Sequence, residues 1–178
     1  METLANHPSS FDPELIFNYQ LWRLASLASA PLIRLCEGRY GVTRREVIML
    51  IFLGHEGSLS PSKLAQRVGL DRPRTSMAIR NLLEKKLVDR LPSPGDSRRA
   101  LIALNARGKA LLEVLFPQML EVNQRVLNAL TPNEQTAFKI MLQKLTAHAG
   151  QLNQQLFTDV HADRRTGGAR QVNLPPET

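Results

Sequence analysis

Arginine, lysine and asparagine side chains gather between Ser60 and Leu104, and these are the residues of the chain best suited to recognising a ligand. Residues 60–100 hold ten Lys/Arg against four Asp/Glu, a formal charge of +6, and the whole chain carries +7. Guanidinium groups pair with guanine edges, and carboxamides pair with adenine. The clustered charge therefore predicts a phosphate-binding surface of the kind that nucleic-acid-binding proteins present.

Residues 72–86 predict one uninterrupted helix with two chemically different faces. Asp71 is suited to cap its first turn, where Pro73 loses little by lacking an N–H. At about 100° per residue, one face carries Thr75, Ile79, Leu82 and Leu83. The opposite face has no expected partner in the chain and carries Pro73, Arg74, Met77, Arg80 and Asn81. Taken alone, this helix is also compatible with an ordinary solvated surface helix.

The flanking residues predict a helix before this one and a hairpin after it. Ser60 and Pro61 suit the start of a short helix, and Gly69 suits its end. Residues 87–91 alternate as a strand does, residues 92–96 favour a turn, and residues 98–104 predict the returning strand. Together these elements predict a helix-turn-helix with a wing, which holds one helix in the major groove of DNA.

Two sequence stretches, LSPSKLAQRVGLDRPRTSMAIRNLLEKKLV and VDRLPSPGDSRRALIALNARGKALL, resemble the helix-turn-helix and the wing of MarR-type transcriptional regulators. The resemblance covers roughly residues 12–150. It implies a homodimer on pseudo-palindromic double-stranded DNA, usually a repressor that a small ligand releases. It also implies that Arg98 enters the minor groove, that Asp96 holds it in the wing, and that Arg74 meets bases. Pro92 and Pro94 lie around the wing tip, depart from the family pattern and predict a stiffer wing. The DNA-binding residues expected are Ser60, Ser62, Lys63, Arg72, Pro73, Arg74, Ser76, Met77, Arg80, Asn81, Arg98 and Arg99.

The expected fold is mainly α with a small β-wing, a winged helix-turn-helix that is dimeric through its N- and C-terminal helices. The expected segments are an irregular N-terminus (1–11), a dimerisation helix (12–42), the DNA-binding domain (43–104), C-terminal dimerisation helices (105–157) and a disordered tail (158–178). Pro31 is expected to kink or split its helix, and Pro117 is expected to kink the helix that contains it. Capping boxes at Thr43 and Thr131 predict two helix starts. More apolar helix surface than one small domain can bury favours a dimer over a monomer whose end helices fold back.

Composition excludes several other classes of protein. A single Cys rules out an intrachain disulfide framework, and the four His are too scattered to predict a metal site. No phosphate loop, nucleotide fingerprint or Ser-His-Asp order supports an enzyme or a cofactor. Neither a secretory signal nor an apolar run of membrane-spanning length is present, so a cytoplasmic protein without a membrane partner is expected.

The MarR resemblance also implies an effector site, because relatives often hold small aromatic or phenolic acids in a crevice beside the dimer helices. Tyr19, Trp22 and Arg23 would supply a stacking face and a carboxylate partner there, with Arg45 and His55 as weaker candidates. Dimer core plus a surface arginine is an equally good interpretation of the first three.

Two alternative functions remain open from the residues. Cys36 could act as a redox sensor if Arg34 and Arg39 lower the pKa of its thiol, although a small buried hydrophobe is the favoured interpretation. The helix-turn-helix could instead serve as an interaction module that grips an acidic protein.

Overall fold

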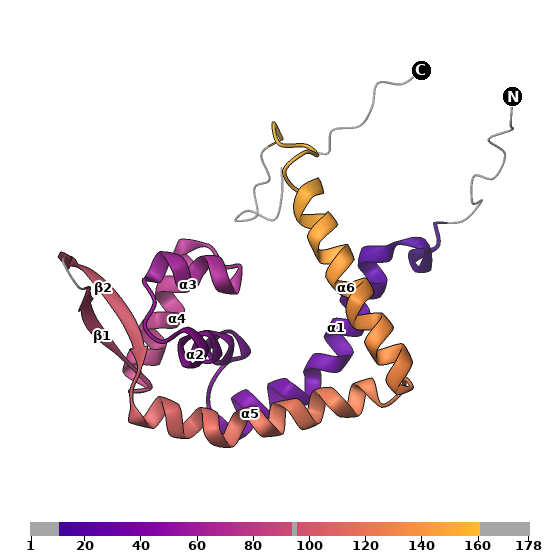
Figure 1. Ribbon diagram of the computed structural model, residues 1–178. Coiled ribbons are helices and arrows are strands. Elements are labelled where there is room, and N and C mark those ends of the chain that lie inside the picture. The colour runs from indigo at the N-terminus through magenta and orange to yellow at the C-terminus, as the bar shows by residue number, and fades with distance from the viewer. Residues whose placement is uncertain (1–10, 94–95, 161–178) are drawn as a thin grey trace, which may run out of the picture. The chain divides into compact units, whose positions relative to one another are not determined.

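The computed structural model describes residues 11–93 and 96–160, without the side chains of residues 93 and 96–99 (Figure 1). The expected irregular N-terminus and most of the expected tail lie outside this part of the chain. The described residues form two compact units, which divide between Asn128 and Ala129. The first unit contains a 3-10 turn (Pro13–Leu15), α1 (Phe17–Ile33), a π-helix (Arg34–Arg39), α2 (Arg44–Glu56), α3 (Pro61–Val68), α4 (Arg72–Glu84), β1 (Val88–Ser93), β2 (Asp96–Leu104) and α5 (Ala106–Leu127). The second contains α6 (Pro132–Leu152). The expected class, mainly α with a small two-stranded sheet, is confirmed.

The N-terminal helix differs from its prediction at both ends. Asp12 caps only the 3-10 turn, where its Oδ1 accepts from the Glu14 N–H at 2.9 Å, and α1 starts later, at Phe17. Pro31 does not split the helix, because the chain continues directly into the π-helix that begins at Arg34. A proline inside a helix removes one donor from the hydrogen-bond ladder, and a local widening of the following turns accommodates that loss.

The other helix boundaries follow local chemistry closely. Thr43 and Glu46 form the predicted capping box, with the Thr43 N–H donating to Glu46 Oε2 at 2.7 Å. α5 runs through Pro117 without ending, and the kink expected at this residue stays a prediction. α6 starts at the predicted box and ends at Leu152, earlier than the expected end near residue 157.

The core of the first unit lies where α2, α3, α4 and the base of the wing meet. Its largest fully buried side chains include Met49, Leu50, Leu53, Leu64, Leu82 and Ile102. β1 pairs antiparallel with β2, and an isolated bridge joins Leu59 to Ile102 on the second strand. α5 comes close behind the wing, because a Cβ on Gly108 would lie 2.0 Å from the Leu87 carbonyl oxygen. The wing therefore packs together with α2, α3 and α4 in one body. α1 lies beside α5, away from the wing (Figure 1).

Candidate nucleic-acid interface

α4, the predicted recognition helix, is positioned by its cap and by its inner face. Asp71 Oδ1 accepts from the Arg74 N–H at 2.8 Å, and the Thr75 hydroxyl donates to the Asp71 carbonyl at 2.8 Å. Thr75, Ile79 and Leu82 are buried as predicted, Leu83 is half-buried, and Ala78 joins them. The helix thus has one fixed orientation against the core.

The C-terminal end of α4 is tied to the start of α2 by an ion pair that the sequence did not reveal. Lys85 Nζ lies 2.7 Å from Glu46 Oε2, and the Glu46 side chain is only 1 % exposed. Lys85 therefore belongs to the scaffold, although the sequence analysis counted it with the basic surface. The capping box identifies Glu46 as a cap, but nothing local indicates a partner 39 residues further along the chain.

The face of α4 opposite the core stays in solvent, and so does the start of α3. The exposed members of the predicted DNA-binding set are Ser62, Lys63, Arg72, Pro73, Arg74, Ser76, Met77 and Arg80, while Ser60 and Asn81 are half-buried. Within the part of the chain that the structure describes, neither Arg72 nor Arg80 forms an ion pair. Their guanidinium groups are free to meet an anionic partner.

Three more cations on this surface have carboxylate partners nearby. Glu56 forms an ion pair with Arg67, in which Arg67 Nε lies 2.8 Å from Glu56 Oε1. Lys63 Nζ lies 3.9 Å from the other carboxylate oxygen, Glu56 Oε2. Arg74 Nε lies 3.5 Å from Asp71 Oδ2. Exposed ion pairs of this kind contribute about 0–1 kcal/mol, so these cations can exchange their partner for a phosphate at little cost.

The wing carries the remaining predicted contacts. The β2 backbone places Asp96, Arg98 and Arg99 next to the turn that joins the strands. Their side chains lie outside the described residues, so the pairing of Asp96 with Arg98 stays a prediction. β1 and β2 lose regular register between Pro92 and Ser93.

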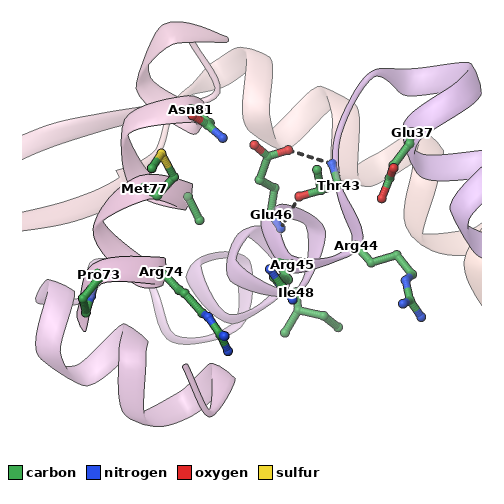
Figure 2. A pocket seen from close by; sticks show the side chains of 11 residues that line it. Glu37, Thr43, Arg44, Arg45, Glu46, Ile48, Pro73, Arg74, Met77 and Asn81 are labelled. Carbon is green, nitrogen blue, oxygen red and sulfur yellow. Dashed lines mark hydrogen bonds between the residues drawn. The ribbon is translucent and has the colours of Figure 1, made fainter. Parts of the chain in front are cut away.

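The residues predicted for an effector do not gather in one place. The Tyr19 and Trp22 rings lie 6.0 Å apart on α1, and Arg23 Nη1 already has Glu14 Oε1 at 2.7 Å. Arg45 instead lines a cavity of about 600 Å³ between α2 and α4, which Figure 2 shows from close by. That cavity does not include Tyr19, Trp22, Arg23 or His55.

Cys36 is fully buried in the π-helix. Burial raises the pKa of the Cys36 thiol, Glu37 raises it further, and only Arg44 opposes them. The burial agrees with the favoured interpretation of Cys36 as a small buried hydrophobe, and the raised pKa is opposite to the lowering that the redox alternative requires. Among the described residues, no group of three or more His, Cys, Asp or Glu side chains is placed to hold a metal ion. No helix in residues 11–93 and 96–160 is long and apolar enough to cross a membrane.

Comparisons with known proteins agree with this geometry. The sequence profile of the MarR family matches residues 40–99. The HTH-type transcriptional repressor NicR of Pseudomonas putida is 25% identical over 104 residues, which cover 58% of this chain and 66%, just under two thirds, of NicR. An HTH-type transcriptional repressor of Mycobacterium tuberculosis is 29% identical over 127 residues, 71% of this chain and 91% of that protein.

A solved structure shows the same fold over most of the chain. Bordetella bronchiseptica BpsR, whose DNA binding is regulated by 6-hydroxynicotinic acid, matches with a TM-score of 0.71 at 23% identity. The match covers 79% of this chain and 98% of BpsR. The helix-turn-helix and wing of this chain are thus similar to the MarR family over residues 40–99, and most of the chain has the same fold as BpsR.

Proposed function

We propose that this regulator is a homodimeric repressor that binds a pseudo-palindromic DNA operator and leaves it when a small organic acid binds. The observation that carries the proposal is the outer face of α4, where Arg72 and Arg80 stay in solvent without a carboxylate partner among the described residues. The inner face of α4 already packs against the core, so the outer face is not needed to hold the fold of the chain together. Arginine on an exposed helix is suited to read guanine edges in the major groove.

The terminal helices support the two-fold assembly. α1 buries no residue and leaves Trp22 and Leu27 64% and 69% exposed. α6 buries no residue either, and Ile140, Met141 and Leu145 are each about half exposed. Exposed apolar surface on this scale marks an interaction surface. A second copy would cover it, and a two-fold dimer would set two α4 helices one turn of DNA apart, about 34–36 Å.

The sign of regulation and the effector class are supported by the relatives. NicR and the mycobacterial protein are named repressors, and the DNA binding of BpsR responds to 6-hydroxynicotinic acid, a small hydroxylated aromatic acid. An effector can release DNA only by its differential affinity for the bound and free forms of the protein.

The test is selection of duplexes from the source genome by the full-length protein, followed by gel retardation. Arg74→Ala should weaken the selected site by about 1–3 kcal/mol and relax one base position. Lys63→Ala should weaken all duplexes equally and reduce the salt slope by about 1. Arg125→Ala is the matched control, since Arg125 lies on α5 and is paired with Glu121 at 2.6 Å.

Sequence-specific retention lost in Arg74→Ala supports the proposal. Retention that is equally strong for every duplex, or unchanged in Arg74→Ala, contradicts it and favours an interaction module for an acidic protein partner instead.

A further inference from the structure

The ion pair between Lys85 and Glu46 is poorly suited to stabilise the fold. The Glu46 side chain is 1 % exposed, and its Oε2 accepts from both the Thr43 N–H and Lys85 Nζ at 2.7 Å. Its Oε1 is shielded from solvent and accepts from no described group, and Figure 2 shows this oxygen turned away from Thr43. A buried ion pair gains little over apolar side chains of similar volume, and an acceptor without a donor lowers that gain further. The pair therefore calls for a role besides stability.

The backbone on which Lys85 sits is held rigidly at the end of α4. The Lys85 N–H donates to the Asn81 carbonyl at 2.9 Å, and the Lys86 N–H donates to the Leu83 carbonyl at 2.9 Å. Lys86 has a left-handed φ of 55°, as residues that close a helix with such bonds do. Asn105, at the start of α5, donates from Nδ2 to the Lys86 carbonyl at 3.1 Å. Lys85 therefore cannot move alone, and its ion pair fixes the last turn of α4 relative to α2.

The apolar contacts beneath α4 hold this last turn less closely. Hydrophobic attraction is non-directional, so the packing of Ile79 and Leu82 opposes a small slide or tilt of the helix only weakly. A charge-assisted hydrogen bond has a preferred length and direction. Asn81 lies one turn before Lys85, and Arg80 is its neighbour, so a shift of the last turn moves both of these expected base contacts.

We propose that Glu46 and Lys85 are positioning residues for base recognition by α4. They contact no base and hold the end of the helix where Arg80 and Asn81 reach the base edges. The role rests on the proposed function, because it needs α4 to read DNA. Contacts to base edges need a placement within about 0.5 Å, whereas attraction to phosphates does not. A released helix end thus keeps its affinity for DNA in general and loses its discrimination between sequences.

The experiment measures the dissociation constants of the full-length protein for a selected duplex and for a scrambled duplex of equal length, by fluorescence anisotropy. The ratio of the two constants reports discrimination, and the folded fraction of the protein cancels in it. A variant that only destabilises the fold therefore leaves the ratio intact. Lys85→Met keeps an unbranched side chain without the charge, and it should lower the ratio about tenfold, the value of one misplaced base contact. Lys85→Arg restores a cation and should recover most of the ratio.

A direct phosphate contact by Lys85, whose side chain is 35% exposed, is the competing explanation. Loss of a phosphate contact weakens both duplexes equally and reduces the salt slope by about 1. Loss of positioning leaves the salt slope unchanged and relaxes the same base position as Arg80→Ala. Lys86→Met is the matched control, because Lys86 is exposed and forms no ion pair with any residue that the structure describes. It removes the same charge one residue away and should leave the ratio intact.

Glu46→Gln tests the role from a residue too deeply buried to meet DNA. The variant keeps an oxygen for Thr43 and Lys85 and removes the charge, so the ratio should fall less, about threefold. In the double variant with Lys85→Met, the ratio should fall no further than in Lys85→Met alone, because both changes act through one contact.

An unchanged ratio in Lys85→Met, a reduced salt slope with equal losses, or losses that multiply in the double variant would each overturn the positioning role and leave the proposed function standing. A wild-type protein that prefers no duplex would overturn the proposed function, and the positioning role with it.

Discussion

α4 and α6 are both capped helices with two unlike faces, but the faces they leave in solvent are opposite in chemistry. α4 buries Ile79 and Leu82 within its own unit and leaves Arg72 and Arg80 outside. α6 buries nothing, and its apolar residues such as Leu145 remain about half exposed. The helix-turn-helix therefore has its own core and lacks only a polar, anionic partner, whereas α6 lacks the apolar partner that would complete it.

The largest effect should come from placing a charge on the apolar face of α6. In the proposed two-fold dimer, Leu145→Asp puts two carboxylates into the interface, one from each copy, where each loses its hydration. We expect the dimer dissociation constant to rise roughly a thousandfold, which corresponds to about 4 kcal/mol. Light scattering over a range of protein concentrations measures it.

Gln143→Asp is the matched control for that variant, because it adds the same charge to a polar, exposed position of α6. A dimer weakened equally by both substitutions would show that net charge, and not the apolar face, matters. A wild-type protein that stays monomeric at every concentration would show that the apolar face of α6 does not bind a second copy, and would contradict the contrast drawn between α4 and α6.

The second prediction concerns the core beneath α4. Leu82 is fully buried, and Leu82→Ala should lower the free energy of unfolding by about 2–5 kcal/mol because it leaves a cavity. The loss should not depend on protein concentration, because Leu82 packs inside one chain. Urea unfolding followed by circular dichroism measures it.

The matched control is Leu91→Ala, at a wing leucine that is 43% exposed, and its expected cost is within about 0.5–1 kcal/mol. A Leu82→Ala loss that grows on dilution would mean that the first unit also depends on a second copy for its core.

The third prediction concerns the polar face of α4. Arg80→Ala should reduce affinity for a selected duplex by about 1–3 kcal/mol and leave the free energy of unfolding unchanged. Arg107→Ala removes an exposed arginine from the first turn of α5 and serves as the control. Equal losses for the two variants would point to charge in general, and a stability loss in Arg80→Ala would show that this face has a structural role after all.

Much of the difference between α4 and α6 could be predicted from the sequence, because it depends on residues that are close together in the chain. Caps act over three residues, so Thr43, Asp71 and Thr131 each identified a helix start from spacing alone. The buried and exposed faces of α4 followed from helical periodicity for the same reason. The sequence therefore predicted the helix-turn-helix and its exposed cations before any contact was known.

Contacts between residues that are far apart in the sequence could not be predicted from the sequence. Glu46 meets Lys85 across 39 positions, and Gly108 lets α5 approach the carbonyl of Leu87, but neither contact has a local signature. The pKa of the Cys36 thiol also depends on contacts of this kind. Its sequence neighbours include arginines, but burial, which is set by the tertiary packing, is the largest influence on the thiol.

The smallest expected effect lies at the start of α6 and depends on pH. The Thr131 N–H donates to Glu134 Oε2 at 2.7 Å, and this backbone hydrogen bond, with the Thr131 hydroxyl, lowers the pKa of the Glu134 carboxyl. A carboxyl whose folded pKa lies below its unfolded value stabilises the fold above the unfolded pKa, and that contribution disappears as the pH falls through the folded pKa.

Glu134→Gln should therefore destabilise α6 slightly at neutral pH and not at all in acid. Unfolding at a series of pH values measures the difference, and Thr131→Ala should reduce its pH dependence without abolishing it, because the carboxylate loses the hydroxyl and keeps the backbone N–H. A difference that persists unchanged into acid would mean that Glu134 acts through helix propensity, and the start of α6 would then owe nothing to its capping box.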